Sequence, residues 1–182
     1  MAQTARRSAS GTQMIVALLV LLVPILGISF AFTRNPDPQV PSVAYAPVAA
    51  RAATASEYVV YAPATLPAGW TCTLAQWLPA GASGQAKAVV GDTWSMAFLT
   101  PERRYVGLDQ RAAAPDAFVT ERTREGSQDG ASTAAGLDWT RYVSDDGRTR
   151  SLVHVDDSVV VVSGDLPYAD LEAFAATLAP AG

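Results

Sequence analysis

The 182-residue chain has a single cysteine and a single histidine, Cys72 and His154. One cysteine forms no internal disulfide, so disulfide bonds do not hold this fold together. One histidine supplies at most one metal ligand, and no further His or Cys pair stands at the spacing of a zinc site. Any Ser-His-Asp or Cys-His machinery would have to use His154. The sequence therefore assigns no catalytic, cofactor-binding or metal-binding residue, and it predicts a non-enzymatic protein.

Basic residues are also few, with 13 Lys and Arg against 17 Asp and Glu. Two of the basic residues, Arg6 and Arg7, precede a long apolar segment, and the chain after it carries eleven basic and seventeen acidic residues, a net charge of −6. Nucleic-acid binding needs clustered positive charge to release counterions from phosphates. We therefore expect no nucleic-acid partner.

The longest feature present is the apolar segment "MIVALLVLLVPILGISFAF", from Met14 to Phe32. A helix of this length spans about 28 Å, close to the hydrocarbon thickness of a bilayer. No charged residue lies between Arg7 and Arg34, and Pro24 is tolerated as a kink within lipid. The sequence predicts a transmembrane helix over 14–32 that acts as a signal anchor, with the lipid bilayer as its partner.

A cleaved secretory signal is the alternative interpretation of this segment. Arg6 and Arg7 supply its basic start, and Ser29-Phe30-Ala31 has the small-x-small pattern of a cleavage site. The apolar run exceeds the usual signal core, which favours retention, and cleavage after Ala31 stays open. The positive-inside rule places residues 1–13 in the cytoplasm and the C-terminal part outside, as in a single-pass cell-membrane protein.

Residues 33–56 hold four prolines and many alanines without a sustained apolar period. Proline favours extended chain, so this segment predicts a Pro/Ala-rich linker. Residues 57–182 then form one extracytoplasmic domain, long enough to bury a core of its own.

Alternating apolar and polar residues dominate this domain and predict strands. In "TWSMAFLTP", Trp94, Met96 and Phe98 share one side, and "RYVGLDQ" is the expected hairpin partner. By the same alternation Trp70, Cys72 and Leu74 share a face. Three more strands are expected in "LDWTRYVS", "TRSLVHVD" and "SVVVVSG", the last of them central because it is apolar on both faces.

Two segments have the helical pattern instead. "APDAFVTERTRE" has Phe118 as its apolar anchor, and "GSQDGAS" breaks it. Near the C-terminus, Leu171, Phe174, Ala175 and Leu178 recur at helical spacing. The predicted fold is α+β: an N-terminal transmembrane helix, then a mainly antiparallel sheet of about six to seven strands with two helices packed on it.

The apolar span, the Pro/Ala spacer, "LPAGW", "FLTPERRYVGLDQ", "DAFV" and "LDWTRYVSDDGRTRSLV" together resemble an actinobacterial family of single-span proteins, domain of unknown function 4245. The resemblance covers nearly the whole chain, and the Thr-Pro…Arg-Tyr-Val-Gly-Leu segment is its most specific part. At Glu102-Arg103 the chain departs from the Asp-Gly type of turn expected for the family. The resemblance implies an exported, anchored domain and brings no activity.

Two groups of polar residues are candidate binding sites. The acidic pairs Asp145-Asp146 and Asp156-Asp157 offer hard oxygen ligands for calcium, yet they lack the spaced oxygens of a calcium loop and are typical of hairpin turns. Several arginines have the chemistry to grip a phosphate or carboxylate, but interspersed glutamates favour local ion pairs instead; they are Arg103, Arg104, Arg122 and Arg124. The four tryptophans favour a core role over a binding platform.

The sequence thus predicts a membrane-anchored extracytoplasmic module of the cell envelope that binds or scaffolds, with an envelope protein or wall polymer as partner. An exposed apolar groove or sheet edge beside a helix would favour this reading. The alternative is an envelope hydrolase or transferase, which needs His154 or the paired carboxylates within hydrogen-bond reach in a pocket. The sequence specifies neither the ligand, nor the biological process, nor the oligomeric state.

Overall fold

A computed structural model describes residues 11–33, 40–84, 87–88, 91–112 and 116–182 of the chain. The chain divides into two units, Met1–Gln39 and Val40–Gly182, which are described separately below.

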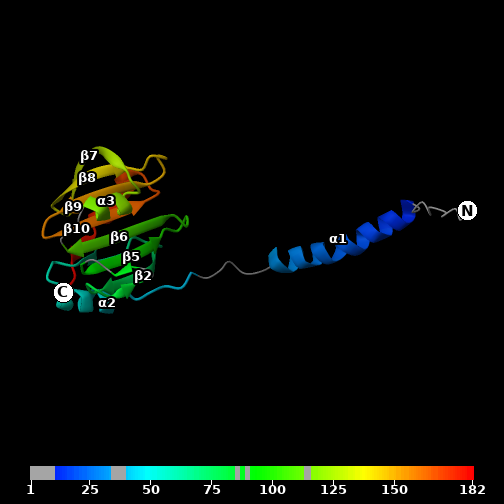
Figure 1. Cartoon of the computed structure of the whole chain (residues 1–182), viewed down its shortest axis with the longest axis horizontal. Helices are drawn as coiled ribbons and strands as arrows, with labels where there is room; N and C mark the ends of the chain where they lie inside the picture. Colours follow the sequence, from blue (N-terminus) through cyan, green and yellow to red (C-terminus); the bar gives the residue numbers. More distant parts are fainter. Residues whose placement is uncertain (1–10, 34–39, 85–86, 89–90, 113–115) are drawn as a thin grey trace, which may run out of the picture. The chain divides into compact units, whose positions relative to one another are not determined.

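The first unit contains helix α1, Gly11–Thr33 (Figure 1). It runs through Pro24 without interruption, as expected of a kink that does not end the helix. Its described large apolar side chains are exposed, with Leu21 at 66% and Phe30 at 62%. Over the residues that the structure describes, no helix combines the length and apolarity that identify a membrane span.

The second unit is built on a seven-stranded sheet whose neighbouring strands all pair antiparallel (Figure 1). Its spatial order is β2-β5-β6-β10-β9-β8-β7. The strands are β2 (Thr71–Leu78), β5 (Thr93–Leu99), β6 (Tyr105–Ala112), β7 (Ser127–Ala134), β8 (Leu137–Val143), β9 (Arg150–Val155) and β10 (Ser158–Gly164). The predicted antiparallel sheet is confirmed.

Two short strand pairs stand outside this sheet. They are β1 (Tyr61–Pro63) with β11 (Leu178–Pro180), and β3 (Ser83–Gly84) with β4 (Lys87–Ala88). The first pair joins the first strand of the domain to its last, because Ala62 lies opposite Ala179.

Strand β10 occupies the middle of the sheet, and all seven of its residues are buried. The valines Val159 to Val162 face helices or packed chain on both sides, which is why neither face of this strand is polar. The prediction of a central valine strand is confirmed.

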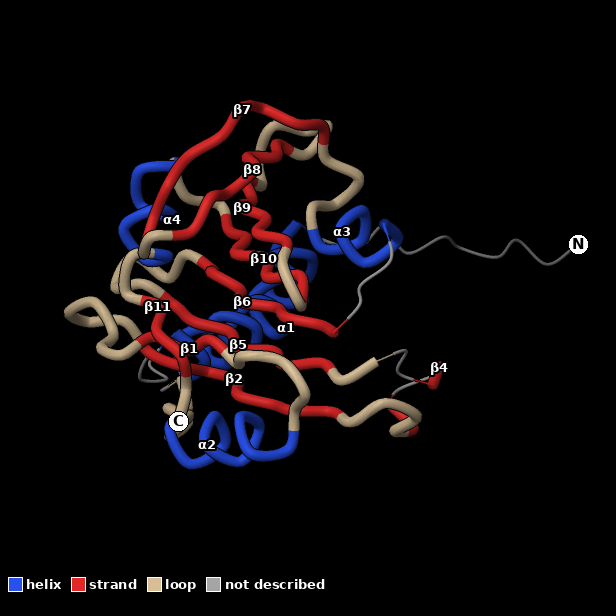
Figure 2. Tube along the Cα trace, turned by 90° about the vertical axis from the view of Figure 1, so that its left-hand side faces the viewer, coloured by secondary structure: helices blue, strands red, loops and turns tan. Residues whose placement is uncertain are grey.

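Helices cover both faces of the sheet, with α3 (Asp116–Arg122) on one side and α4 (Tyr168–Ala175) on the other (Figure 2). The larger core lies on the α4 side and includes Trp94, Phe98 and Phe174. On the α3 side, Phe118 packs on the valines of β9 and β10 in a smaller cluster. Phe118 therefore anchors its helix, as the sequence predicts.

The expected linker over 33–56 is wrong over its second half. Residues Ala46–Ala55 form helix α2, with Pro47 in its first turn, and Ala49 and Ala52 are buried against the core. Alanine has the highest helix propensity, and proline is well tolerated in a first helical turn, so the same composition that suggested a spacer forms a helix. The compact domain begins near Val40 and not at residue 57.

Strand β2 departs from the predicted alternation. A bulge between Cys72 and Leu74 shifts the register against β5, so Cys72 is 1% exposed whereas Leu74 is 43% exposed. A bulge inserts one extra residue and turns the following side chains to the other face. The prediction that Trp70, Cys72 and Leu74 share a face is therefore wrong for Leu74.

Two further segments differ from prediction. "GSQDGAS" was expected to be a break, but Ser127–Ala134 forms edge strand β7, which pairs with β8. The C-terminal helix ends at Ala175, and Leu178 is buried from strand β11 instead. The domain also carries three described helices, where two were predicted.

Candidate functional site

His154 lies on β9, and its ring is 5.6 Å from that of Trp139. Its Nδ1 is 2.8 Å from the carbonyl oxygen of Asp138, an acceptor, so Nδ1 carries the proton of this hydrogen bond. The acidic pairs occupy the turns at the two ends of β9, which lie about 20 Å apart for a six-residue strand. The structure therefore does not bring His154 and both acidic pairs together.

In the first acidic pair, Asp146 stabilises its own turn. The carboxylate of Asp146 accepts hydrogen bonds from the Ser144 hydroxyl at 2.6 Å and from the Arg148 N–H at 3.0 Å. These two bonds hold the pKa of Asp146 below its usual range. No described group of three or more His, Cys, Asp or Glu side chains is arranged to hold a metal ion.

The tryptophans are structural. Trp94 and Trp139 are buried, and their indole N–H groups donate to the carbonyl oxygens of Tyr61 and Ala134. Trp70, half-buried, stacks on a core phenylalanine, and the fourth indole donates to Ser56. The core interpretation of the tryptophans is thus supported.

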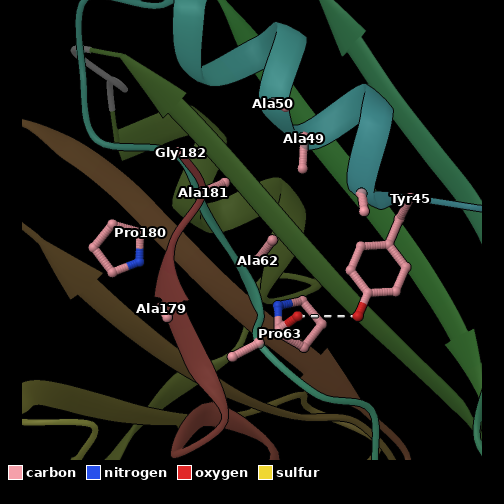
Figure 3. A pocket seen from close by; sticks show the side chains of 11 residues that line it. Tyr45, Ala49, Ala50, Ala62, Pro63, Ala179, Pro180, Ala181 and Gly182 are labelled. Carbon is pink, nitrogen blue, oxygen red and sulfur yellow. Dashed lines mark hydrogen bonds between the residues drawn. The ribbon is translucent and has the colours of Figure 1, made fainter.

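An apolar groove lies between α2 and the β1·β11 pair (Figure 3). Its volume is about 310 Å³, and alanine and proline dominate its lining. The Tyr45 hydroxyl closes one end by donating to the carbonyl oxygen of Pro63 at 3.0 Å. The groove is an exposed apolar feature next to a helix, but its lining offers little chemistry to select a ligand.

A buried polar cluster lies under α3, on the opposite side of the sheet. The carboxylate of Asp109, on β6, accepts a hydrogen bond from Ser95 at 2.7 Å and faces Arg122 at 3.7 Å. Burial raises the pKa of Asp109, while Arg122 and Ser95 oppose the rise. The guanidinium of Arg122 also lies over the Phe118 ring, and its Nε is buried without a hydrogen-bond partner among the described residues.

Beside this cluster is a polar pocket of about 260 Å³ at one end of the central strands. Five segments contribute to it: the start of β6, the loop after α3, the turn before β9, the end of β10 and the residue that follows β10. Its lining is Tyr105, Arg124, Arg148, Thr149, Ser163, Gly164 and Asp165. A concave site with convergent polar groups is the usual form of a binding site for small molecules.

Tyr105 forms one wall of the pocket because its ring folds back over Gly107. A Cβ at Gly107 would lie 2.9 Å from the Tyr105 hydroxyl and 3.4 Å from the Ser163 Oγ, so both oxygens lie on the same side of the sheet. Burial raises the pKa of the Tyr105 hydroxyl and Asp109 raises it further, whereas Arg122 and Arg124 lower it. The Tyr105 hydroxyl thus lies among charged groups.

Arg124 is held in the pocket wall by an uncommon backbone. Both Arg124 and Glu125 have positive φ, 56° and 55°, after the last turn of α3. The Glu125 N–H donates to the carbonyl oxygen of Thr120 at 2.7 Å, which closes this turn. Left-handed residues other than glycine are uncommon and cluster at functional sites.

The arginines differ in their partners. Arg104 pairs with Asp165, and Arg122 with Asp109 and Glu121, whereas neither Arg124 nor Arg148 forms a salt bridge with any residue that the structure describes. The prediction of local ion pairs is therefore correct for Arg122 and wrong for Arg124, and it is wrong for Arg104, whose partner Asp165 is distant in the sequence. Arg148 was not singled out from the sequence, since it stands alone in a turn and only the fold brings it near Arg124.

Comparison with known proteins agrees with the resemblance described above. A family model described as "Protein of unknown function (DUF4245)" matches residues 6–178, so the chain belongs to this family. No curated protein matches the chain.

Proposed function

We propose that this member of the DUF4245 family is a membrane-anchored binding module, whose ligand site is the pocket formed by Tyr105, Arg124 and Arg148. One observation carries the proposal: two arginines without a salt bridge to any described residue converge on a concave site, in a chain that is acidic as a whole. Positive charge that the fold leaves uncompensated is available to a ligand of opposite charge.

The anchor in this proposal is α1. The segment from Met14 to Phe32 carries no charged residue, and the described large apolar side chains of α1 are exposed. Leaving this much apolar surface in water is unfavourable, whereas a bilayer accepts it. By the positive-inside rule, Arg6 and Arg7 at the N-terminal side support an extracytoplasmic binding domain, and in this proposal the envelope supplies its ligands.

The hydrolase or transferase alternative gains no support from these residues. General acid–base catalysis needs its groups within hydrogen-bond reach of one reacting centre. Nδ1 of His154 is already bonded to a backbone carbonyl, and the acidic pairs lie at the two ends of the same strand. We therefore propose binding without turnover.

A panel of small ligands tests the binding role. The full chain in a maltoside detergent is heated with phosphates, carboxylates, sulfate or neutral polyols, and its Tm is measured. A ligand that binds only the folded state raises the Tm. At least one anion should do so in the native chain and fail in Arg124→Gln/Arg148→Gln. If none of the anions changes the Tm, the binding role is wrong.

Topology is tested separately by labelling intact cells with an impermeant thiol reagent. Ala50 is exposed on α2, and native Cys72 is buried, so Ala50→Cys should be labelled while the unsubstituted chain stays unlabelled. Ser8→Cys, on the expected cytoplasmic side, should be labelled only after lysis. Labelling of Ser8→Cys but not Ala50→Cys in whole cells would reverse the orientation.

A further inference from the structure

We propose that the pocket lined by Tyr105, Arg124 and Arg148 binds a phosphate group, either free phosphate or a phosphate monoester. The inference rests on the proposed function, because it names the class of ligand for the same pocket.

Charge is the first argument. Arg124 and Arg148 bring two positive charges to the pocket, and the negative charge of Asp165 is offset by Arg104, whose Nε lies 3.5 Å from its carboxylate. A phosphate monoester carries about −1.5 to −2 at neutral pH. Two arginines match this charge, whereas a single carboxylate would leave one arginine uncompensated.

The arrangement of the donors is the second argument. A carboxylate is planar and is satisfied by one arginine in a bidentate pair. A phosphate is tetrahedral and accepts hydrogen bonds from several directions. Here the donors approach from separate elements: Arg124 from the loop after α3, Arg148 from the turn before β9, and Tyr105 from β6.

Hydroxyl groups in the pocket wall are the third argument. Thr149 and Ser163 line the pocket and are largely buried, at 7% and 9% exposed. Ser151, opposite Ser163 on the next strand, lies outside this lining, and its buried Oγ has no hydrogen-bond partner among the described residues. A hydroxyl in the wall of a pocket can donate a hydrogen bond to a phosphate oxygen, so Thr149 and Ser163 add to the donors that the arginines supply.

Asp146 is the competing partner for both arginines, since both help to lower its pKa. Its carboxylate is already engaged by the Ser144 hydroxyl and by the Arg148 backbone N–H. Neither guanidinium forms a salt bridge with it. Asp146 therefore orders the turn that carries Arg148 and leaves the guanidinium to a ligand.

Size limits what can be attached to the phosphate. The volume of about 260 Å³ lies below the roughly 300 to 1,000 Å³ of pockets for drug-sized ligands. We therefore assign a phosphate group with at most a small substituent inside the pocket, and any larger part of the ligand extends into solvent.

Isothermal titration calorimetry on the full chain in maltoside micelles and phosphate-free buffer tests this assignment. The probes are inorganic phosphate, glycerol 3-phosphate, succinate as a dianion of another shape, and glycerol as a neutral control. We expect at least one phosphate to bind more tightly than succinate, and no binding of glycerol. Tighter binding of glycerol 3-phosphate would identify a monoester as the source.

Matched variants locate the site. Arg124→Gln/Arg148→Gln should weaken phosphate binding about 100-fold, since each charge-assisted contact is worth about a factor of ten or more. Arg51→Gln removes a charge from the exposed side of α2 and should leave phosphate binding unchanged. Equal Tm values would show that all variants fold alike.

Three results would overturn the phosphate assignment. These are succinate binding at least as tightly as both phosphates, phosphate binding that survives the double substitution, and equal loss in Arg51→Gln. Tight succinate binding that is lost in the double variant would leave the binding module intact while removing phosphate as its ligand.

Discussion

Trp70 lies flat against Phe174, with ring centroids 5.2 Å apart and 8° between the ring planes. Phe174 also meets Phe98 of β5 at 5.1 Å in a tilted arrangement. The turn before β2, the central sheet and helix α4 are thus joined through one aromatic side chain. This contact links segments a hundred residues apart in the sequence.

Substitution of Phe174 should be among the most destabilising changes in the domain. Phe174→Ala leaves a cavity at a side chain that is 1% exposed, and we expect a loss of about 3–5 kcal/mol in the free energy of unfolding. A double-mutant cycle with Trp70→Ala should give a coupling of about 0.5–1.5 kcal/mol. Phe118→Ala, on the other face, should couple to Trp70→Ala by less than about 0.5 kcal/mol. Equal coupling in both cycles would contradict the stacking argument.

The sheet could be predicted from the sequence where side-chain alternation is strict. Trp94, Met96 and Phe98 face the core because the strand has no irregularity, and the valine strand is central because both of its faces are apolar. The face on which the Leu74 side chain lies could not be predicted, since a β-bulge does not alter the hydrophobic pattern of the sequence. Strand β7 was missed because its residues are polar and exposed, and it forms only through its pairing with β8.

The pocket could be predicted only in part. Arg124 was singled out, but the neighbouring Glu121 and Glu125 favoured an ion pair, and the positive φ of Arg124 is not visible in the sequence. Arg148 and Ser163 come from distant segments that only the strand order brings together. A site assembled from several strand ends has no linear motif to find.

Asp109 should make stability depend on pH in the direction opposite to most carboxylates. Because burial raises its pKa above the unfolded value, its protonated form is favoured in the folded state. As the pH falls through this raised pKa, the native chain should therefore gain stability relative to Asp109→Asn. The groups facing Asp109 are Ser95, Tyr105, Arg111, Glu121 and Arg122.

Urea denaturation of the native chain and Asp109→Asn, at neutral and acidic pH, measures this difference. The comparison removes the contributions of other carboxylates, which are common to both proteins. If the native chain instead loses stability relative to the variant as the pH falls, the ion pair with Arg122 outweighs burial.

Helix α2 should be an integral part of the domain. Ala52 is fully buried, so Ala52→Leu overpacks the contact and should cost about 1–3 kcal/mol. Ala50→Leu, two residues earlier on the exposed side of the same helix, should change stability by less than about 0.5 kcal/mol. Equal Tm values for the two variants would restore the linker interpretation of this segment.

Cys72 should be unreactive while the domain is folded. Its side chain is buried, its Sγ lies 3.2 Å from the carbonyl oxygen of Leu74, and burial raises its pKa. Since the thiolate is the reactive form, a thiol reagent should modify the native chain far more slowly than the chain in urea. Ala50→Cys provides the exposed comparison. Similar rates at the two cysteines would show that the β2 bulge opens readily.

Gly107 should affect the phosphate affinity of the pocket without contributing a side chain to it, because it leaves room for the Tyr105 hydroxyl. A methyl group there would stand 2.9 Å from the Tyr105 hydroxyl, the free end of a side chain that can turn away, so Gly107→Ala should displace Tyr105 at little cost in stability. Phosphate affinity should fall by about tenfold, the value of one charge-assisted hydrogen bond. Tyr105→Phe removes the hydroxyl without displacing the ring and should weaken binding to a similar extent. Because the two substitutions remove the same donor by different means, the double variant should bind phosphate only a little more weakly than either single variant by calorimetry. If the losses of phosphate affinity add, Gly107 acts on the pocket by another route.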